Sequence, residues 1–166
     1  MKLKNLLSEK RATILGKWFD LIVESYPADT SSFLKNQKNR FTNPVGHTIL
    51  EGIEGLFDEL LNGMDSEKAL PFLDSIIRIR AIQDFTPSRS INFIFLLKKV
   101  IREEIKSDHE FDLRPGNEIE EELLMLESKI DGLALLSFDI YMKCREKIHE
   151  ISSKDLKNRT LFRIKR

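Results

Sequence analysis

Residues 119–151 read IEEELLMLESKIDGLALLSFDIYMKCREKIHEI, an apolar row interrupted at regular steps by charged residues. The row advances mainly by alternating steps of four and three, the repeat of a helix that buries one face. Its members are Ile119, Leu123, Leu126, Ile130, Leu133, Ser137, Ile140, Cys144, Ile148 and Ile151. A helix of about 35 residues is about 50 Å long, which exceeds the width of a domain this size. We therefore expect its far end to meet another subunit or to project.

Two helices upstream of this row begin with a polar cap followed by proline. Thr86-Pro87 opens a helix that ends at residue 107, and Asn43-Pro44 opens one that ends at residue 63. An oxygen of the cap side chain accepts a free backbone N–H, and proline in the first turn has no N–H to leave unpaired. Within the first of these helices, residues 91–97 are apolar nearly all round, so we expect other helices to surround them.

The remaining segments complete an all-α domain. Apolar periodicity predicts helices over residues 3–26 and 66–84, whereas residues 28–42 read as a loop with one short helix at most, anchored by Phe33 and Phe41. The expected architecture has about six helices, of which the last two are long and antiparallel.

Three glycines lie inside the helix that follows Asn43: Gly46, Gly52 and Gly55. Each costs a helix up to about 1 kcal/mol relative to alanine. Either another helix approaches closely at these positions, or the glycines are simply tolerated.

Composition bounds the class of protein. The 166 residues are 41% hydrophobic and 33% charged, with 27 Lys and Arg against 27 Asp and Glu. Such a chain forms a globular core, and its zero net charge creates no global field that would attract nucleic acid or a membrane. Residues 1–151 are expected to form one helical domain. Residues 152–166 are expected to form a basic tail, a pattern most often seen in solvated ends.

Compartment and topology follow from the cysteine count and the apolar runs. The single cysteine, Cys144, excludes an internal disulfide and a cysteine-based zinc site, and its place in the apolar row predicts a buried side chain. The apolar runs are too short for a signal peptide or a membrane span. We expect a cytoplasmic protein without membrane insertion.

No arrangement typical of catalysis is found in the sequence. The histidines, His47, His109 and His149, lie in different segments without the spacing of metal ligands. Carboxylates such as Glu103-Glu104 fall opposite the apolar rows, where solvent leaves them untuned. Glycine-rich phosphate loops and nucleophile elbows are missing. The sequence predicts neither an enzyme nor a metal protein.

Residues 76–88 are the exception to this plain pattern, because charged residues interrupt a strongly apolar helix before a capped turn. Arg80 continues the apolar row and must be paired or reach solvent; Asp84 stands four residues on. Arg78 stands four residues after an aspartate in the same way. One interpretation is a structural junction of ion pairs that includes Arg78, Asp84 and Pro87.

The alternative interpretation makes the same junction the polar lining of a ligand pocket. Arg80 and Gln83 would then face an anionic head group, and Phe93 the apolar part of the ligand. His47 is a further candidate ligand-binding residue. Both interpretations stay open at this point.

Four short strings carry a resemblance to a known family. Trp18 with Tyr26-Pro27, FTNPVG at residues 41–46, IRIRAIQDFTPS at residues 77–88 and FLLK at residues 95–98 resemble the RsbRD N-terminal-domain family. The resemblance spans most of the chain. It implies a globin-like helical fold without haem and the sensor half of a stressosome-type co-antagonist.

The family's sensor domain is usually followed by a STAS domain, for which this chain leaves no room. The resemblance therefore implies a stand-alone regulatory domain that binds a ligand or partner and changes conformation. A homodimer through the last two helices and a protein partner in signalling are expected.

Two alternatives to this function remain. A scaffold would bind a protein through the long helix and the tail, without any small ligand. A haem-binding globin-like sensor is disfavoured, because no histidine lies between residues 64 and 108 and His47 could approach haem only from the opposite side. The cavity, if present, would hold an apolar, fatty-acid-like molecule or nothing.

Overall fold

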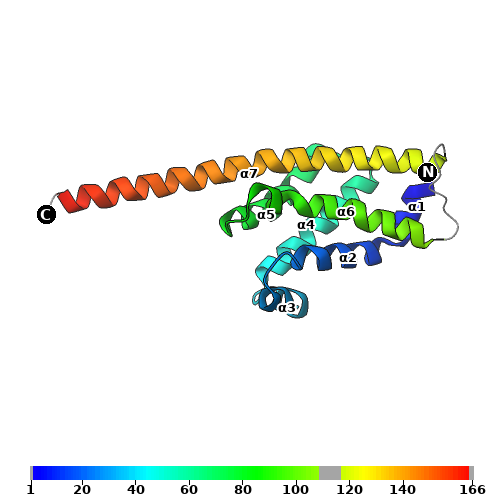
Figure 1. Ribbon diagram of the computed structural model, residues 1–166, viewed down its shortest axis with the longest axis horizontal. Helices are drawn as coiled ribbons and strands as arrows, with labels where there is room; N and C mark the ends of the chain where they lie inside the picture. Colours follow the sequence, from blue (N-terminus) through cyan, green and yellow to red (C-terminus); the bar gives the residue numbers. More distant parts are fainter. Residues whose placement is uncertain (1, 109–116, 165–166) are drawn as a thin grey trace.

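A computed structural model describes residues 2–108 and 117–164, with side chains to residue 160. Seven helices and no strand occur in this described part (Figure 1), which confirms the predicted all-α class. The helices are α1 (Lys2–Glu9), α2 (Arg11–Val23), α3 (Ala28–Asn36), α4 (Pro44–Leu61), α5 (Ser66–Ile82), α6 (Pro87–Ser107) and α7 (Glu118–Ile164). His109 lies outside the described residues.

Both predicted caps are confirmed. The Asn43 side chain accepts the Gly46 N–H at 2.9 Å and donates to two carbonyl groups at the end of α3, so it fixes the loop before α4 as well as the helix start. Thr86 Oγ1 accepts the N–H of Arg89 at 3.4 Å, with Pro87 in the first position of α6.

α6 lies between α2 and α7 at the centre of the core. Phe93, Ile94 and Leu97 are buried as expected, but Phe95 is 42% exposed. Only part of the apolar run is therefore surrounded. The face that carries Phe95 is left open in this single chain.

The first predicted helix is two helices, since α1 ends at Glu9 and α2 begins at Arg11. Neither glycine nor proline marks the break. Lys10 sits at the bend and pairs with Glu104 and Asp108 at the end of α6, and α1 packs on α7. Long-range contacts set this break, which local sequence signals do not show.

The two phenylalanines expected to anchor residues 28–42 do not do so. Phe33 is 45% exposed and Phe41 is 95% exposed, whereas Leu34 is buried beneath α3. The buried Asn43 side chain, with its three hydrogen bonds, holds this segment instead.

Glycines in α4 allow α5 to approach closely. A Cβ at Gly52 would lie 2.7 Å from Ile76 Cδ1, and one at Gly55 would lie 2.4 Å from the ring of Phe72. At Gly46 the neighbour is the α4 cap, Asn43, rather than another helix. The close-approach interpretation therefore holds for Gly52 and Gly55.

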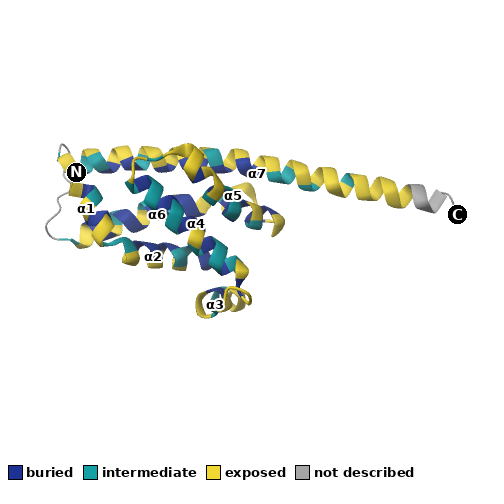
Figure 2. Ribbon diagram, turned by 180° about the vertical axis from the view of Figure 1, so that it is seen from behind, coloured by how far each residue is buried: buried dark blue, intermediate teal, exposed yellow. Residues whose placement is uncertain are grey.

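α7 runs antiparallel to α6 and then leaves the body of the domain (Figure 1). Its buried residues end near Tyr141, and the remainder is mostly exposed (Figure 2). The helix continues through the basic segment as far as Ile164. Cys144, expected to be buried, is only half-buried because it lines an open pocket between α5 and α7.

Candidate functional site

The corner between α5 and α6 is a tight turn with an unusual backbone. Gln83 caps the end of α5, and Asp84 follows with φ of +57°, in the left-handed region that aspartate tolerates better than most residues. The N–H of Phe85 then donates to the carbonyl of Arg80 at 3.1 Å, which closes the turn before Thr86 caps α6.

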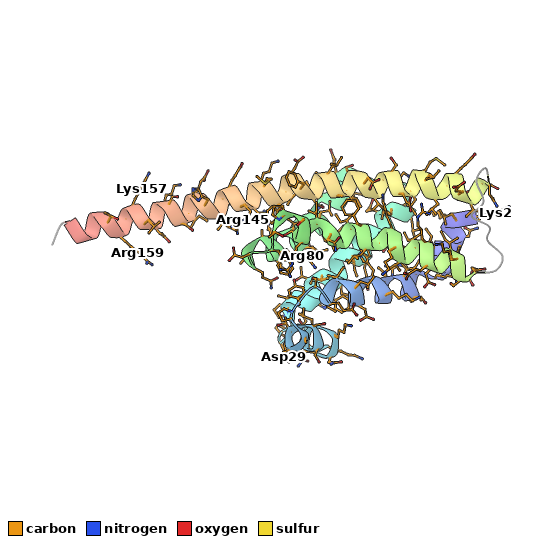
Figure 3. The ribbon with its side chains drawn as sticks, in the orientation of Figure 1. Lys2, Asp29, Arg80, Arg145, Lys157 and Arg159 are labelled. Carbon is orange, nitrogen blue, oxygen red and sulfur yellow. The ribbon has the colours of Figure 1, made fainter. Side chains whose placement is uncertain are left out.

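Arg80 points into this corner and is 1% exposed (Figure 3). Its Nη1 donates to the carbonyl of Arg89 at 2.9 Å and its Nη2 to Ser25 Oγ at 3.2 Å. Nε is buried without a hydrogen-bond partner in the described structure. The guanidinium thus rests on neutral acceptors, and its burial lowers the pKa of Arg80 from the usual value.

The predicted pairing of Arg80 with Asp84 is wrong. Asp84 Oδ1 accepts from Arg145 of α7 at 2.9 Å, and its side chain is 85% exposed. The four-residue spacing brings two side chains together only within a helix, and α5 ends at Ile82. The other predicted pair exists, since Arg78 Nε lies 2.6 Å from Asp74 Oδ2 on the surface.

Three aromatic rings surround the buried guanidinium. The carbon atom Cζ of Arg80 lies 5.7 Å from the ring centre of Tyr26, 5.0 Å from that of Phe85 and 5.5 Å from that of Phe93. Attraction between a cation and the faces of aromatic rings partly replaces the water that the charge has lost. Burial also raises the pKa of Tyr26, an effect that the charge of Arg80 partly offsets.

The corner brings together three of the four predicted ligand-binding residues. Gln83 is exposed, and its Oε1 accepts a hydrogen bond from the Tyr26 hydroxyl at 2.9 Å. Phe93 packs against both Arg80 and Trp18. His47 lies elsewhere, on α4, where it contacts Glu51 at 3.0 Å. Pro87 begins α6 at the exposed edge of the corner.

Two residues of α7 hold the corner, and the sequence interpretation missed both. The Tyr141 hydroxyl donates to the carbonyl of Phe85 at 2.5 Å, and Arg145 Nη1 donates to the carbonyl of Ala81 at 3.1 Å as well as to Asp84. Figure 3 shows Arg145 where α7 begins to leave the core. A signal was available: Tyr141 and Arg145 continue an apolar row at helical spacing, as Arg80 does.

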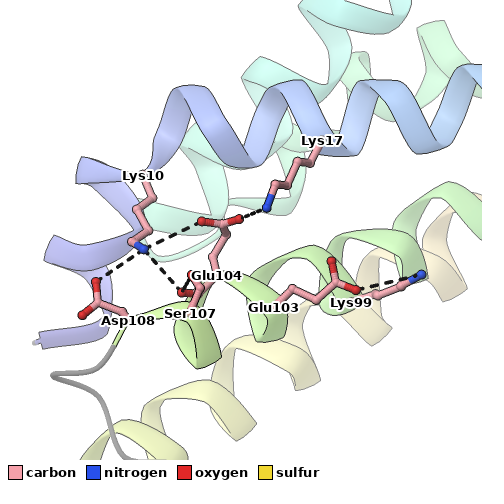
Figure 4. Close-up of polar contacts among 7 residues, drawn as sticks. All are labelled: Lys10, Lys17, Lys99, Glu103, Glu104, Ser107 and Asp108. Carbon is pink, nitrogen blue, oxygen red and sulfur yellow. Dashed lines mark hydrogen bonds and ion pairs between the residues drawn. The ribbon is translucent and has the colours of Figure 1, made fainter.

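A second polar cluster corrects the expectation for Glu103-Glu104. Glu103 is exposed, but Glu104 is buried and its Oε1 accepts from Lys17 Nζ at 2.5 Å (Figure 4). Lys10 lies 3.8 Å from the same carboxylate and 3.4 Å from that of Asp108. The hydrogen bond to Glu104 raises the pKa of Lys17. Because this cluster ties α2 to the end of α6, it has a structural role.

The described part of the chain contains neither a candidate metal site nor a candidate membrane-spanning helix. Within residues 2–108 and 117–164, no three His, Cys, Asp or Glu side chains gather closely enough to hold a metal ion. In the same part of the chain, no helix is long and apolar enough to cross a membrane.

These features define an all-helical domain in which a buried polar corner contacts a long helix that leaves the core. Residues 12–154 match the family model of the RsbT co-antagonist protein rsbRD N-terminal domain, and the chain belongs to this family. The family is one of stressosome-type regulatory domains in sigma-factor signalling and is not known as a family of enzymes. No curated protein and no solved structure matches the chain.

Proposed function

We propose that this chain is a regulatory domain that changes conformation when a signal or partner binds, and that the α5–α6 corner passes the change to α7. The proposal rests mainly on the position of Tyr141 and Arg145. These two side chains contact the corner next to Arg80, just before α7 leaves the core. A small shift at the corner would therefore redirect the long projecting arm.

The buried charge supports a corner with two accessible states. A cation held by neutral acceptors keeps much of its desolvation penalty, so an arrangement that gives Arg80 better partners would lie close in free energy. Catalysis and haem have no part in this proposal. The centre of the domain is filled by Trp18 against Phe93, with the Trp18 Nε1–H donated to the Phe93 carbonyl at 2.7 Å.

We further propose that the domain works as a homodimer through α6 and α7. Lys98 lies over the ring of Phe95 at 6.0 Å and pairs with Asp131 of α7 at 2.5 Å. Leu135 follows Asp131 by one turn, so Phe95 and Leu135 share one face. Leu135 is 72% exposed, and Phe138 and Met142 extend the apolar surface. Such a patch is typical of a protein interface.

A hydrogen-exchange experiment on the intact chain tests the coupling. Arg80→Met should change the exchange of amides 138–150 in α7 by about fivefold, which corresponds to about 1 kcal/mol of local stability. Arg78→Gln is the matched control, because Arg78 is on the same helix but pairs with Asp74 at the surface.

Unchanged exchange in α7 of a folded Arg80→Met protein would contradict the coupling. That result would favour the second candidate, a scaffold whose projecting arm binds a protein without any conformational signal. The exposed helical arm beyond Arg145 is the observation that supports this alternative.

A further inference from the structure

An apolar cavity lies away from the α5–α6 corner, at the end of the domain where α1, the end of α4 and the first turns of α7 meet. Its volume is about 230 Å³. Four leucines of its lining are buried members of the core: Leu3, Leu7, Leu60 and Leu126. The exposed Met125 side chain lines it on the solvent side. The cavity therefore has a buried apolar floor and a mouth that is open to solvent.

The size of the cavity limits what it can hold. An apolar cavity of roughly 150 Å³ in another protein is large enough for a benzene molecule. A cavity of 230 Å³ thus accommodates one aromatic ring or a short alkyl chain, with room for a linking group. The turn after α4, in which Gly63 and Met64 have φ of +105° and +70°, borders the cavity, since Asn62 and Gly63 are part of its lining.

The charges around the mouth are not balanced. Glu122 also lines the cavity; its Oε2 accepts the backbone N–H of Leu3 at 3.1 Å, which positions the carboxylate but leaves its negative charge in place. Lys2 pairs with Glu118 at 3.6 Å. Lys4 of α1 and Lys129 of α7 both line the cavity, and neither forms an ion pair with a residue in the described part of the chain. The lining therefore carries two ammonium groups against one carboxylate, and its net charge is positive.

We propose that this cavity binds a small amphipathic anion. The ring or short chain of the ligand lies on the leucine floor, and its carboxylate, sulfonate or phosphate group is held between the ammonium groups of Lys4 and Lys129. Apolar surface supplies most of the affinity, and the two cations select the sign of the head group. The site is separate from the α5–α6 corner, so the proposal goes beyond the regulatory function and does not depend on it.

Three compounds that differ only in head group test the chemistry: phenylbutyrate, phenylbutylamine and phenylbutanol. Each is titrated into the intact ¹⁵N-labelled chain while amide chemical shifts are recorded. Phenylbutyrate should shift the amides of α1, the end of α4 and residues 122–129 with saturation, and should bind about tenfold more tightly than the amine. Equal affinity for the amine, shifts confined to the face of Phe95 and Leu135, or shifts that never saturate would overturn the proposal.

Charge variants give an independent reading. Lys129→Gln should weaken phenylbutyrate binding about threefold to fivefold, the range expected for one exposed ion pair, and should leave phenylbutanol binding unchanged. Lys4→Gln should weaken phenylbutyrate binding to a similar degree. Agreement between the two variants would show that the effect comes from the lost charge and not from a local disturbance at one position. Lys154→Gln, an exposed lysine on the projecting part of α7, is the matched control. Unchanged phenylbutyrate affinity in both pocket variants would overturn the role of the lysines. Because these readouts concern the cavity amides alone, failure here leaves the α5–α6 coupling standing.

Discussion

Arg80 is the residue whose environment needs the most explanation. A guanidinium that is 1% exposed would ordinarily be paired with a carboxylate, but here it meets one carbonyl, one hydroxyl and three aromatic rings. These contacts recover only part of the hydration that burial removes. Fold stability alone therefore does not account for an arginine at this position, which is why we propose a role for it in the conformational change.

Two substitutions at Arg80 separate these roles. Arg80→Ala removes the whole side chain and leaves a cavity, so the free energy of unfolding should fall by about 2–4 kcal/mol. Arg80→Met keeps the apolar stem and removes the buried charge, so the free energy should stay within about 1 kcal/mol of the parent chain. Urea unfolding followed by circular dichroism measures both. A loss in Arg80→Met as large as that in Arg80→Ala would show that the charge itself stabilises the fold.

The sequence shows that Arg80 is unusual but not which groups surround it. An arginine on an apolar helical face is visible as a pattern, and three residues of the corner were predicted on that basis. Its actual partners, Ser25 and the carbonyl of Arg89, come from other elements, and a long-range neutral contact leaves no mark in local spacing. The four-residue spacing suggested Asp84 as the partner of Arg80. That prediction failed because α5 ends at Ile82, before Asp84.

Tyr141 offers a test of the contact between α7 and the corner at the residue scale. Tyr141→Phe leaves the ring in place but removes the donor to the buried carbonyl of Phe85. The free energy of unfolding should fall by about 1–2 kcal/mol, because a buried acceptor is left without a partner.

Tyr26→Phe is the comparison for Tyr141→Phe, since the acceptor of the Tyr26 hydroxyl is the exposed Gln83, which water can satisfy. Both variants are measured in the same urea titration. An equal fall in the free energy of unfolding would show that the hydrogen bond to the Phe85 carbonyl contributes no more than the exposed one.

At the scale of elements, the packing of α4 on α5 depends on small residues. Gly52→Ala adds a Cβ 2.7 Å from Ile76 Cδ1, and Ile76 is fully buried and cannot move away freely. Overpacking of about 1–3 kcal/mol should outweigh the helix-propensity gain of about 1 kcal/mol, so the melting temperature should fall.

Gly16→Ala in α2 is the control for this substitution, because nothing lies within 4 Å of its Cβ. At Gly16 the gain in helix propensity is not opposed by overpacking, so the melting temperature should rise. Differential scanning calorimetry of both variants gives the two signs. A rise in both would mean that α4 and α5 can separate slightly at little cost.

Helix starts could be predicted from sequence, whereas breaks and exposed faces could not. Asn43-Pro44 and Thr86-Pro87 act through local hydrogen bonds and fixed φ angles, so a few neighbouring residues specify them. The bend at Lys10 and the buried Glu104 depend on each other across the α2–α6 contact. The projection of α7 was anticipated from length alone, since length is a property that the sequence states directly.

For the whole molecule, the feature that most needs explanation is how the projecting arm of α7 remains helical. Beyond Arg145 the helix has few half-buried residues and no core to pack on. An isolated helix of this length is marginal in water, because most helical stability in proteins comes from packing. A second chain or a signalling partner along the arm would supply that packing.

Self-association is therefore expected, and a single charge should abolish it. Sedimentation velocity over a range of concentrations should give twice the chain mass for the parent protein, whereas Leu135→Asp should give the monomer mass, because a carboxylate on the apolar face would lose its hydration in the interface. Phe41→Asp is the matched control: Phe41 is more exposed than Leu135 but lies before α4, away from the α6–α7 face, so this variant should remain dimeric. If the Leu135→Asp protein stays dimeric, the chains associate through another surface. If the parent chain is monomeric at every concentration, the open face and the arm are left for a different protein.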